Sequence, residues 1–137
     1  MIGADRDDLA ERRPLSPHLT VYRMMLTMAM SMAHRVTGVA LYLGAALLAI
    51  YFVGLAAGPG AYSFVSWIVD GATGKIILIG FVWALYHHLL GGVRHALWDR
   101  GLLMGPVARE AVTQATLAGG VILTALTFYL VTLVRLF

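Results

Sequence analysis

The chain has 137 residues, of which 60% are hydrophobic and 12% are charged, and its mean hydropathy is +0.81. This composition excludes an ordinary soluble domain and predicts an integral membrane protein. The formal net charge is +3, but the basic residues flank apolar stretches, so we expect membrane lipid and not nucleic acid as the partner. Because there is no cysteine, the chain itself holds no iron–sulfur cluster, no covalently attached c-type haem and no disulfide.

Residues 1–23 form a polar arm in which acidic and basic residues alternate before Pro14 and Pro17. The two prolines favour extended backbone. No apolar segment follows at the distance expected of a signal peptide, and acidic residues are too frequent for a transit peptide. We therefore expect the arm to be mature protein and part of a single membrane-anchor domain, residues 1–137.

Residues 24–134 predict an all-α integral membrane fold with three transmembrane helices, at about residues 24–57, 75–97 and 111–134. Each stretch is long enough to cross a bilayer, which takes about 20 residues. The sequence Gly58-Pro59-Gly60 is expected to end the first helix. The connection that follows contains aromatic residues suited to the membrane interface. Three helices suit one part of a heteromeric helical bundle.

Basic residues are unequally divided between the two ends of these helices. With the N-terminus inside, the outer side holds only Lys75 and Arg135. The inner side then holds six arginines: Arg6, Arg12, Arg13, Arg23, Arg100 and Arg109. The positive-inside rule therefore predicts an N-in, C-out orientation.

The third helix carries small residues at helical spacing and no charge between residues 111 and 134. Thr116, Gly120 and Thr124 are each four residues apart, so they lie on one face. Small residues on one face let membrane helices approach closely. We interpret this ladder as helix packing and not as a chemical site.

Two polar clusters, residues 31–38 and 87–95, lie inside the first and second predicted helices. Ionisable groups in hydrocarbon cost several kcal/mol each, so they usually face a site or a partner. At 100° per residue, His88 shares a face with Gly91, Gly92 and His95, whereas His87 lies on a flank about 100° away. Glycines beside an imidazole leave room for a flat macrocycle, so His88 is the better ligand candidate. We assign His87 no role.

The same geometry limits how the histidines combine. His88 and His95 are two turns apart, about 10.5 Å along the helix axis, so they cannot both be axial ligands of one iron. In the first cluster, Ser31, His34 and Arg35 share one face. Arg35 keeps its charge and needs an anion or several acceptors, for which a haem propionate, a quinone carbonyl or the carboxylate of Asp99 would serve. The residues leave these alternatives open, and they do not exclude His34 and His88 binding one iron.

Three motifs follow one another in order over residues 13–99. They are Arg13-Pro14-Leu15-Ser16-Pro17-His18-Leu19, Ser31-x-x-His34-Arg35-x-Thr37-Gly38 and His88-x-x-x-Gly92-x-Arg94-His95-x-x-Trp98-Asp99. Together they resemble the cytochrome b subunit, or large membrane anchor, of succinate dehydrogenase (respiratory complex II). The resemblance implies partnership with a small membrane anchor subunit, an iron–sulfur subunit and a flavoprotein subunit. It also implies that ubiquinone receives electrons from the iron–sulfur subunit.

Carried over by position, the resemblance implies a haem b shared with the small anchor subunit. His88 matches the axial ligand from this chain, and the second axial histidine would belong to the small anchor subunit. His34, Arg35 and His95 match positions near the haem propionates, while Ser31 and Arg35 match positions that line the quinone pocket. The chain alone is expected to have no catalytic residue and no activity, and a bacterial inner membrane is favoured over a mitochondrial one.

Three other readings compete with this one: the anchor of a related quinol:fumarate reductase, a structural anchor without haem, and a small transporter with a proton relay. The face shared by His88, Gly91 and Gly92 argues against the last two.

Overall fold

The computed structural model describes residues 23–136, and the side chains of residues 23–134. The described part contains four helices: α2 (Leu26–Ala56), α3 (Pro59–Asp70), α4 (Ala72–Asp99) and α5 (Pro106–Leu136). The all-α fold is thereby confirmed. The polar arm, with its motif at residues 13–19, lies outside the described residues.

Three of the helices, α2, α4 and α5, are long and apolar enough to cross a membrane. The three predicted transmembrane helices are therefore confirmed, but two of them begin earlier than expected. α4 starts at Ala72 and α5 at Pro106. Proline is favoured in the first turn of a helix, where its missing N–H has no helical partner, so the breaker at Gly105-Pro106 also opens α5.

The connection after the first transmembrane helix is itself helical, which the sequence analysis did not predict. Gly58 ends α2 with a φ of +105°, a conformation that favours glycine, and Pro59 then opens α3. The breaker thus ends one helix and starts the next. Phe64 and Trp67 of α3 are exposed, as expected of aromatic residues at a membrane interface.

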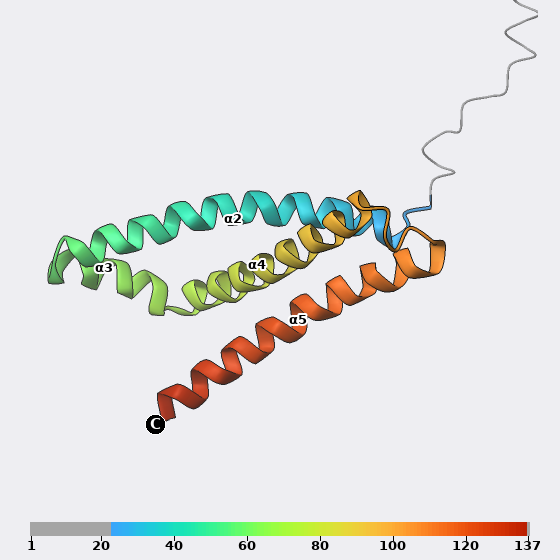
Figure 1. Ribbon diagram of the computed structural model, residues 1–137. Coiled ribbons are helices and arrows are strands. Elements are labelled where there is room, and N and C mark those ends of the chain that lie inside the picture. The colour runs from blue at the N-terminus through green and yellow to red at the C-terminus, as the bar shows by residue number, and fades with distance from the viewer. Residues whose placement is uncertain (1–22, 137) are drawn as a thin grey trace, which may run out of the picture.

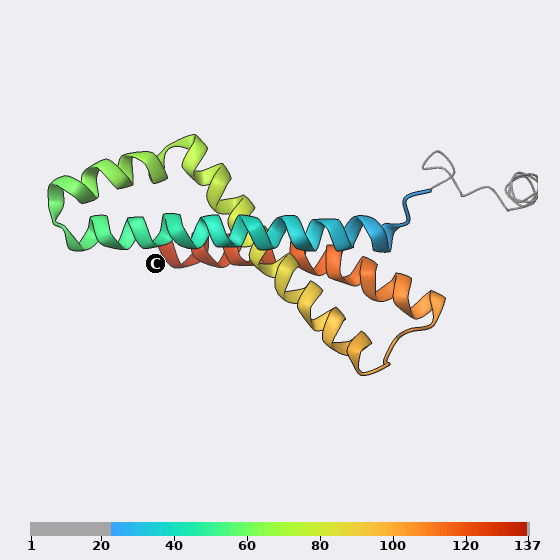
Figure 2. The same cartoon turned by 90° about the horizontal axis from the view of Figure 1, so that it is seen from above.

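α4 is the middle helix, and it packs against both α2 and α5. Figure 1 shows the start of α2, the end of α4 and the start of α5 together at one end of the molecule, with α3 and the end of α5 at the other. Figure 2 shows α4 crossing the other two long helices obliquely. The described chain therefore crosses from one end to the other three times.

Small residues and buried threonines, more than a core of large apolar side chains, mark the helix contacts. Met30 and Ala84 are the buried hydrophobic residues within the described part. Gly44 faces the ring of Phe81, and Gly120 lies against the backbone of His87. Such contacts bring backbones close, as is common between membrane helices.

The predicted ladder on the last helix is confirmed, since Thr116, Gly120 and Thr124 are all buried. The two threonine hydroxyls donate to carbonyls one turn earlier in α5, at 2.8 and 2.7 Å. They are satisfied within their own helix, which agrees with a packing role.

Candidate functional site

The two polar clusters meet where α2 crosses α4. The imidazole rings of His34 and His88 are stacked, with centroids 4.0 Å apart and planes 9° apart. The ring of His95 meets the His34 ring edge-on at 5.2 Å. Three of the residues singled out in the sequence are thus brought together in one cluster.

His34 and His88 also exchange hydrogen bonds across the two helices. His34 Nε2 lies 3.2 Å from the backbone carbonyl oxygen of His88, and His88 Nδ1 lies 3.0 Å from that of His34. A carbonyl oxygen only accepts, so each of these nitrogens is the donor. In a neutral His88 ring this places the hydrogen on Nδ1 and leaves Nε2 with its lone pair.

Thr37 is a third member of this contact, and the sequence analysis gave it no role. Its side chain is buried, and its Oγ1 lies 3.4 Å from His88 Nδ1. The same hydroxyl donates to the carbonyl oxygen of Ala33 or His34, both at 2.9 Å. It can therefore accept a share of the Nδ1 hydrogen. In the sequence, the signal that could have identified Thr37 is its position three residues after His34 and directly before Gly38.

The glycines of the two clusters make room for the opposite histidines. A Cβ on Gly38 would lie 3.0 Å from His88 Cε1, and one on Gly91 would overlap the ring of His34. A Cβ on Gly92 would meet nothing within 4 Å. The space beside Gly91, which the sequence analysis assigned to a macrocycle, therefore holds His34, and Gly92 is the glycine beside open space.

The stacking decides one question that the sequence left open. Two axial ligands of one iron must point at it from opposite sides, and stacked parallel rings cannot do so. His34 and His88 are therefore not both ligands of one iron in this arrangement. Within residues 23–134, no group of three or more His, Cys, Asp or Glu side chains is placed to hold a metal ion.

His87 faces α5 instead of α2, so the predicted separation of the adjacent histidines is confirmed. Its side chain is 0% exposed and its ring stacks on Trp83, with centroids 5.1 Å apart. Arg94 is on the same flank, 2% exposed, with its guanidinium 5.1 Å from the Trp98 ring. Five nitrogens here have no hydrogen-bond partner among the described residues: His87 Nδ1 and Nε2, Arg94 Nε and Nη1, and Trp98 Nε1.

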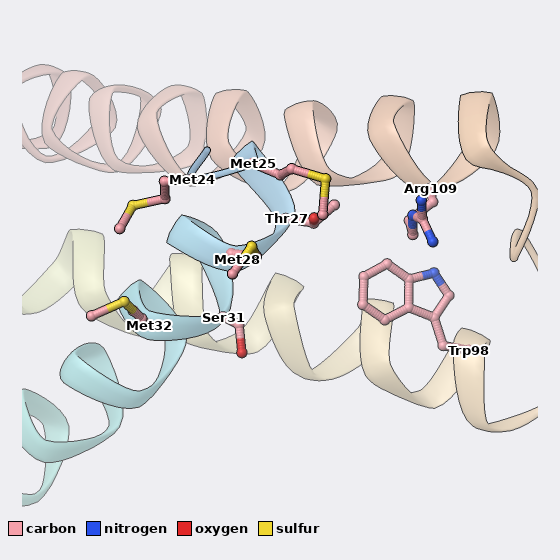
Figure 3. A pocket seen from close by; sticks show the side chains of 8 residues that line it. All are labelled: Met24, Met25, Thr27, Met28, Ser31, Met32, Trp98 and Arg109. Carbon is pink, nitrogen blue, oxygen red and sulfur yellow. The ribbon is translucent and has the colours of Figure 1, made fainter. Parts of the chain in front are cut away.

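Ser31 lines a groove of about 420 Å³ at the end of the molecule where α2 begins (Figure 3). Trp98 of α4 and Arg109 of α5 lie on the same groove. Its other lining residues are Met24, Met25, Thr27, Met28 and Met32. Arg35 is exposed and does not line it, and Asp99 is exposed as well. Sequence reasoning missed Arg109 as a site residue; the signal was its place at the same membrane side as Ser31.

The family model described as succinate dehydrogenase/fumarate reductase transmembrane subunit matches residues 10–133. The chain belongs to this family. It is similar to the succinate dehydrogenase cytochrome b556 subunit of Paracoccus denitrificans, with 43% identity over 84% of this chain and 88% of that protein. It is also similar to the cytochrome b556 subunit of Rickettsia bellii, with 35% identity over 71% of this chain and 75% of that protein.

A mitochondrial relative belongs to the same group. The succinate dehydrogenase cytochrome b560 subunit of Sus scrofa is 38% identical over 69% of this chain, which spans 57% of the pig protein. The resemblance drawn from the three motifs is therefore confirmed. As a transmembrane subunit of this family, with three apolar helices, the chain is a multi-pass membrane protein that serves an enzyme complex.

Proposed function

We propose that this chain is the haem b-binding membrane anchor subunit of a succinate:ubiquinone oxidoreductase and helps to form its quinone-reduction site. In this proposal His88 is the axial ligand from this chain. The small anchor subunit supplies the second axial histidine. Iron–sulfur and flavoprotein subunits complete the complex in a bacterial inner membrane, and this chain alone has no activity.

The observation that carries the proposal is the state of the His88 ring. Its Nδ1–H is donated to the His34 carbonyl, so Nε2 presents a lone pair. A histidine that ligates a metal commonly donates its other N–H to a carbonyl in this way. Among the described residues Nε2 has no hydrogen-bond partner, and it is not one of the buried unpartnered nitrogens. The free lone pair on Nε2 therefore fits a haem iron that lies outside the packed helices α2, α4 and α5.

Open space near His88 supports the same assignment. Gly92, one turn further along α4, has nothing within 4 Å of a Cβ position. A planar group liganded by His88 needs such a flat surface beside the helix. A haem with two imidazole ligands supplies one-electron transfer at a six-coordinate iron, which suits electron transport and not oxygen chemistry.

The propionates of this haem need cationic or donor groups from the chain. His34 and His95 were both predicted near them, and both belong to the histidine cluster. Arg35 follows His34 directly and its side chain is exposed, so it is free to meet a carboxylate from outside the chain.

For ubiquinone we propose the end of the molecule that bears Ser31. The groove beside it combines methionine side chains, which adapt to an apolar ring, with the hydroxyl-bearing residues Thr27 and Ser31 and the guanidinium of Arg109. Ser31 would donate a hydrogen bond to a quinone oxygen, and Arg35, one turn further on, would stabilise negative charge on the reduced quinone. The iron–sulfur subunit would dock at this side and deliver electrons over a short gap.

The test is purification of the whole complex in mild detergent, followed by a reduced-minus-oxidised absorption spectrum. We expect a b-type spectrum that His88→Ala abolishes or severely perturbs. His87→Phe is the matched control, because it changes the adjacent histidine on the other face. If the purified wild-type complex contains no haem, this chain is a structural anchor and not a haem-binding subunit. A normal six-coordinate spectrum in His88→Ala would exclude this chain as the ligand donor.

A further inference from the structure

We propose that His34 is a positioning residue that holds the His88 ring for ligation. This inference rests on the proposed function, in which His88 ligates the haem iron. It adds a role for His34 that the motif alone does not indicate.

Two hydrogen bonds in opposite directions join His34 and His88. His34 Nε2 donates to the backbone carbonyl oxygen of His88, 3.2 Å away, and His88 Nδ1 donates to that of His34 at 3.0 Å. Removing the His34 side chain therefore removes one of these bonds together with the ring that stacks on His88.

The fit of the two rings restrains the His88 imidazole. They are parallel within 9° at 4.0 Å, so His34 covers one face of the His88 imidazole. Gly38 of α2 lies against the edge of the same ring, where an added Cβ would be only 3.0 Å from His88 Cε1. Rotation of His88 about its side-chain bonds would break the stack and the Nδ1 hydrogen bond together. The ring plane is therefore fixed before any metal binds, which is the purpose of a supporting shell around a metal ligand.

The position of the His34 ring requires that Gly91 has no side chain. A Cβ there would overlap the His34 ring, so Gly91→Ala must displace it from His88. Gly80 lies on the same helix with nothing within 4 Å of a Cβ position. Gly80→Ala is therefore the matched control for adding one methyl group to α4.

The experiment uses the assembled complex and measures haem retention and the electron paramagnetic resonance spectrum of the oxidised haem, which depends on the orientation of the axial imidazole planes. We expect His34→Ala and Gly91→Ala to shift and broaden that spectrum and to accelerate haem loss by about 10- to 100-fold. Gly80→Ala should leave both readouts at wild-type values.

The double variant separates this role from general damage to the helix contact. With the His34 ring removed, the methyl group of Gly91→Ala meets empty space, so it should add no further defect to His34→Ala. Independent, additive defects would overturn the inference. Wild-type spectra and wild-type haem retention in both single variants would also overturn the inference. If His88→Ala still loses haem in that case, the proposed function stands although the role of His34 does not.

Thr37→Val keeps the shape of a buried side chain and removes the acceptor 3.4 Å from His88 Nδ1. It serves as the second probe if His34→Ala does not assemble. We expect a smaller spectral shift in the same direction as in Gly91→Ala, with Thr37→Ser restoring the wild-type spectrum. An unchanged spectrum in Thr37→Val together with one in Gly91→Ala would contradict the proposed positioning.

Discussion

At the scale of single residues, the distinction between His87 and His88 depends on helical phase alone. One residue turns the helix by 100°, so the two adjacent imidazoles face α5 and α2 respectively. The ring that faces α2 gains defined partners for Nδ1 and keeps a free Nε2. The ring that faces α5 is enclosed, with both nitrogens unpartnered among the described residues. Neighbouring positions thus have different chemical capacities.

Ser31→Ala is predicted to slow quinone reduction by the assembled complex. Losing one good hydrogen bond to the reduced quinone costs about 1.5–3 kcal/mol, roughly a ten- to hundredfold lower rate. Succinate oxidation with an artificial acceptor that takes electrons at the flavin should stay nearly unchanged, because that chemistry lies in another subunit. Wild-type quinone reduction and unchanged inhibitor affinity would place the quinone elsewhere.

Arg35→Ala is predicted to have the broader phenotype of the two. An exposed guanidinium one turn beyond Ser31 is available both to the quinone and to a haem propionate. We therefore expect slower quinone reduction together with weaker haem retention, which Ser31→Ala should not show. Steady-state quinone assays and haem-to-protein ratios on the same preparations measure the two effects. Normal haem retention in Arg35→Ala would remove its propionate role.

At the scale of helices, two different kinds of contact hold α4. Against α2, glycines on both helices admit aromatic or imidazole rings from the other one. Against α5, buried threonines form much of the contact, and Tyr86 shares a hydrogen bond of 2.8 Å with Thr127. Both contacts depend on small residues. Lipid tails are as apolar as the side chains, so no hydrophobic driving force brings the helices together, and close backbone packing must do so.

Gly44→Ala is predicted to weaken the contact between α2 and α4. The added methyl group would overlap the ring of Phe81, and overpacking of this kind typically costs about 1–3 kcal/mol. Gly80→Ala, which meets open space, should be neutral or slightly stabilising because alanine is the better helix former. Thermal unfolding of the purified complex measures both variants. Equal stability of the two would show that Phe81 moves aside without cost.

His87→Phe is predicted to be tolerated. A phenyl ring keeps the stack on Trp83 and removes two unpartnered nitrogens, whose burial costs about 1–3 kcal/mol each. This gain offsets the extra volume, so we expect normal assembly and thermal stability within about 1.5 kcal/mol of the wild type. A complex that fails to assemble would indicate that a partner or water bonds to the His87 nitrogens.

At the scale of the whole molecule, three long helices cross from one end to the other between residue 23 and the end of α5. Arg23 precedes α2, Arg100 follows α4 and Arg109 lies in the first turn of α5, and these three helix ends meet at one end of the molecule. The groove beside Ser31 is at this end, whereas Lys75 is in the first turn of α4, near the other end. If the positive-inside rule applies, the proposed quinone side faces the cell interior. That is the side from which a soluble iron–sulfur subunit would reach it.

The predicted orientation is tested with single cysteines, since the chain has none of its own. Met104→Cys, between α4 and α5, should react with an impermeant thiol reagent only from the inside. Ser63→Cys, in α3, should react only from the outside. Both sites are exposed in the described chain. Reversed labelling would refute the N-in orientation, and labelling of both sites from the same side would show that α4 does not cross the membrane.

The sequence by itself determined the membrane class, the number of transmembrane helices and the separate faces of His87 and His88. These follow from composition, apolar length and a helical period that hardly changes with surroundings. Only the tertiary structure decided that His34 stacks on His88, that Gly91 makes room for His34, and that Arg109 shares a groove with Ser31. Each of these depends on how helices distant in the sequence cross. The crossing is set by contacts along the whole helix surface, which no local pattern specifies.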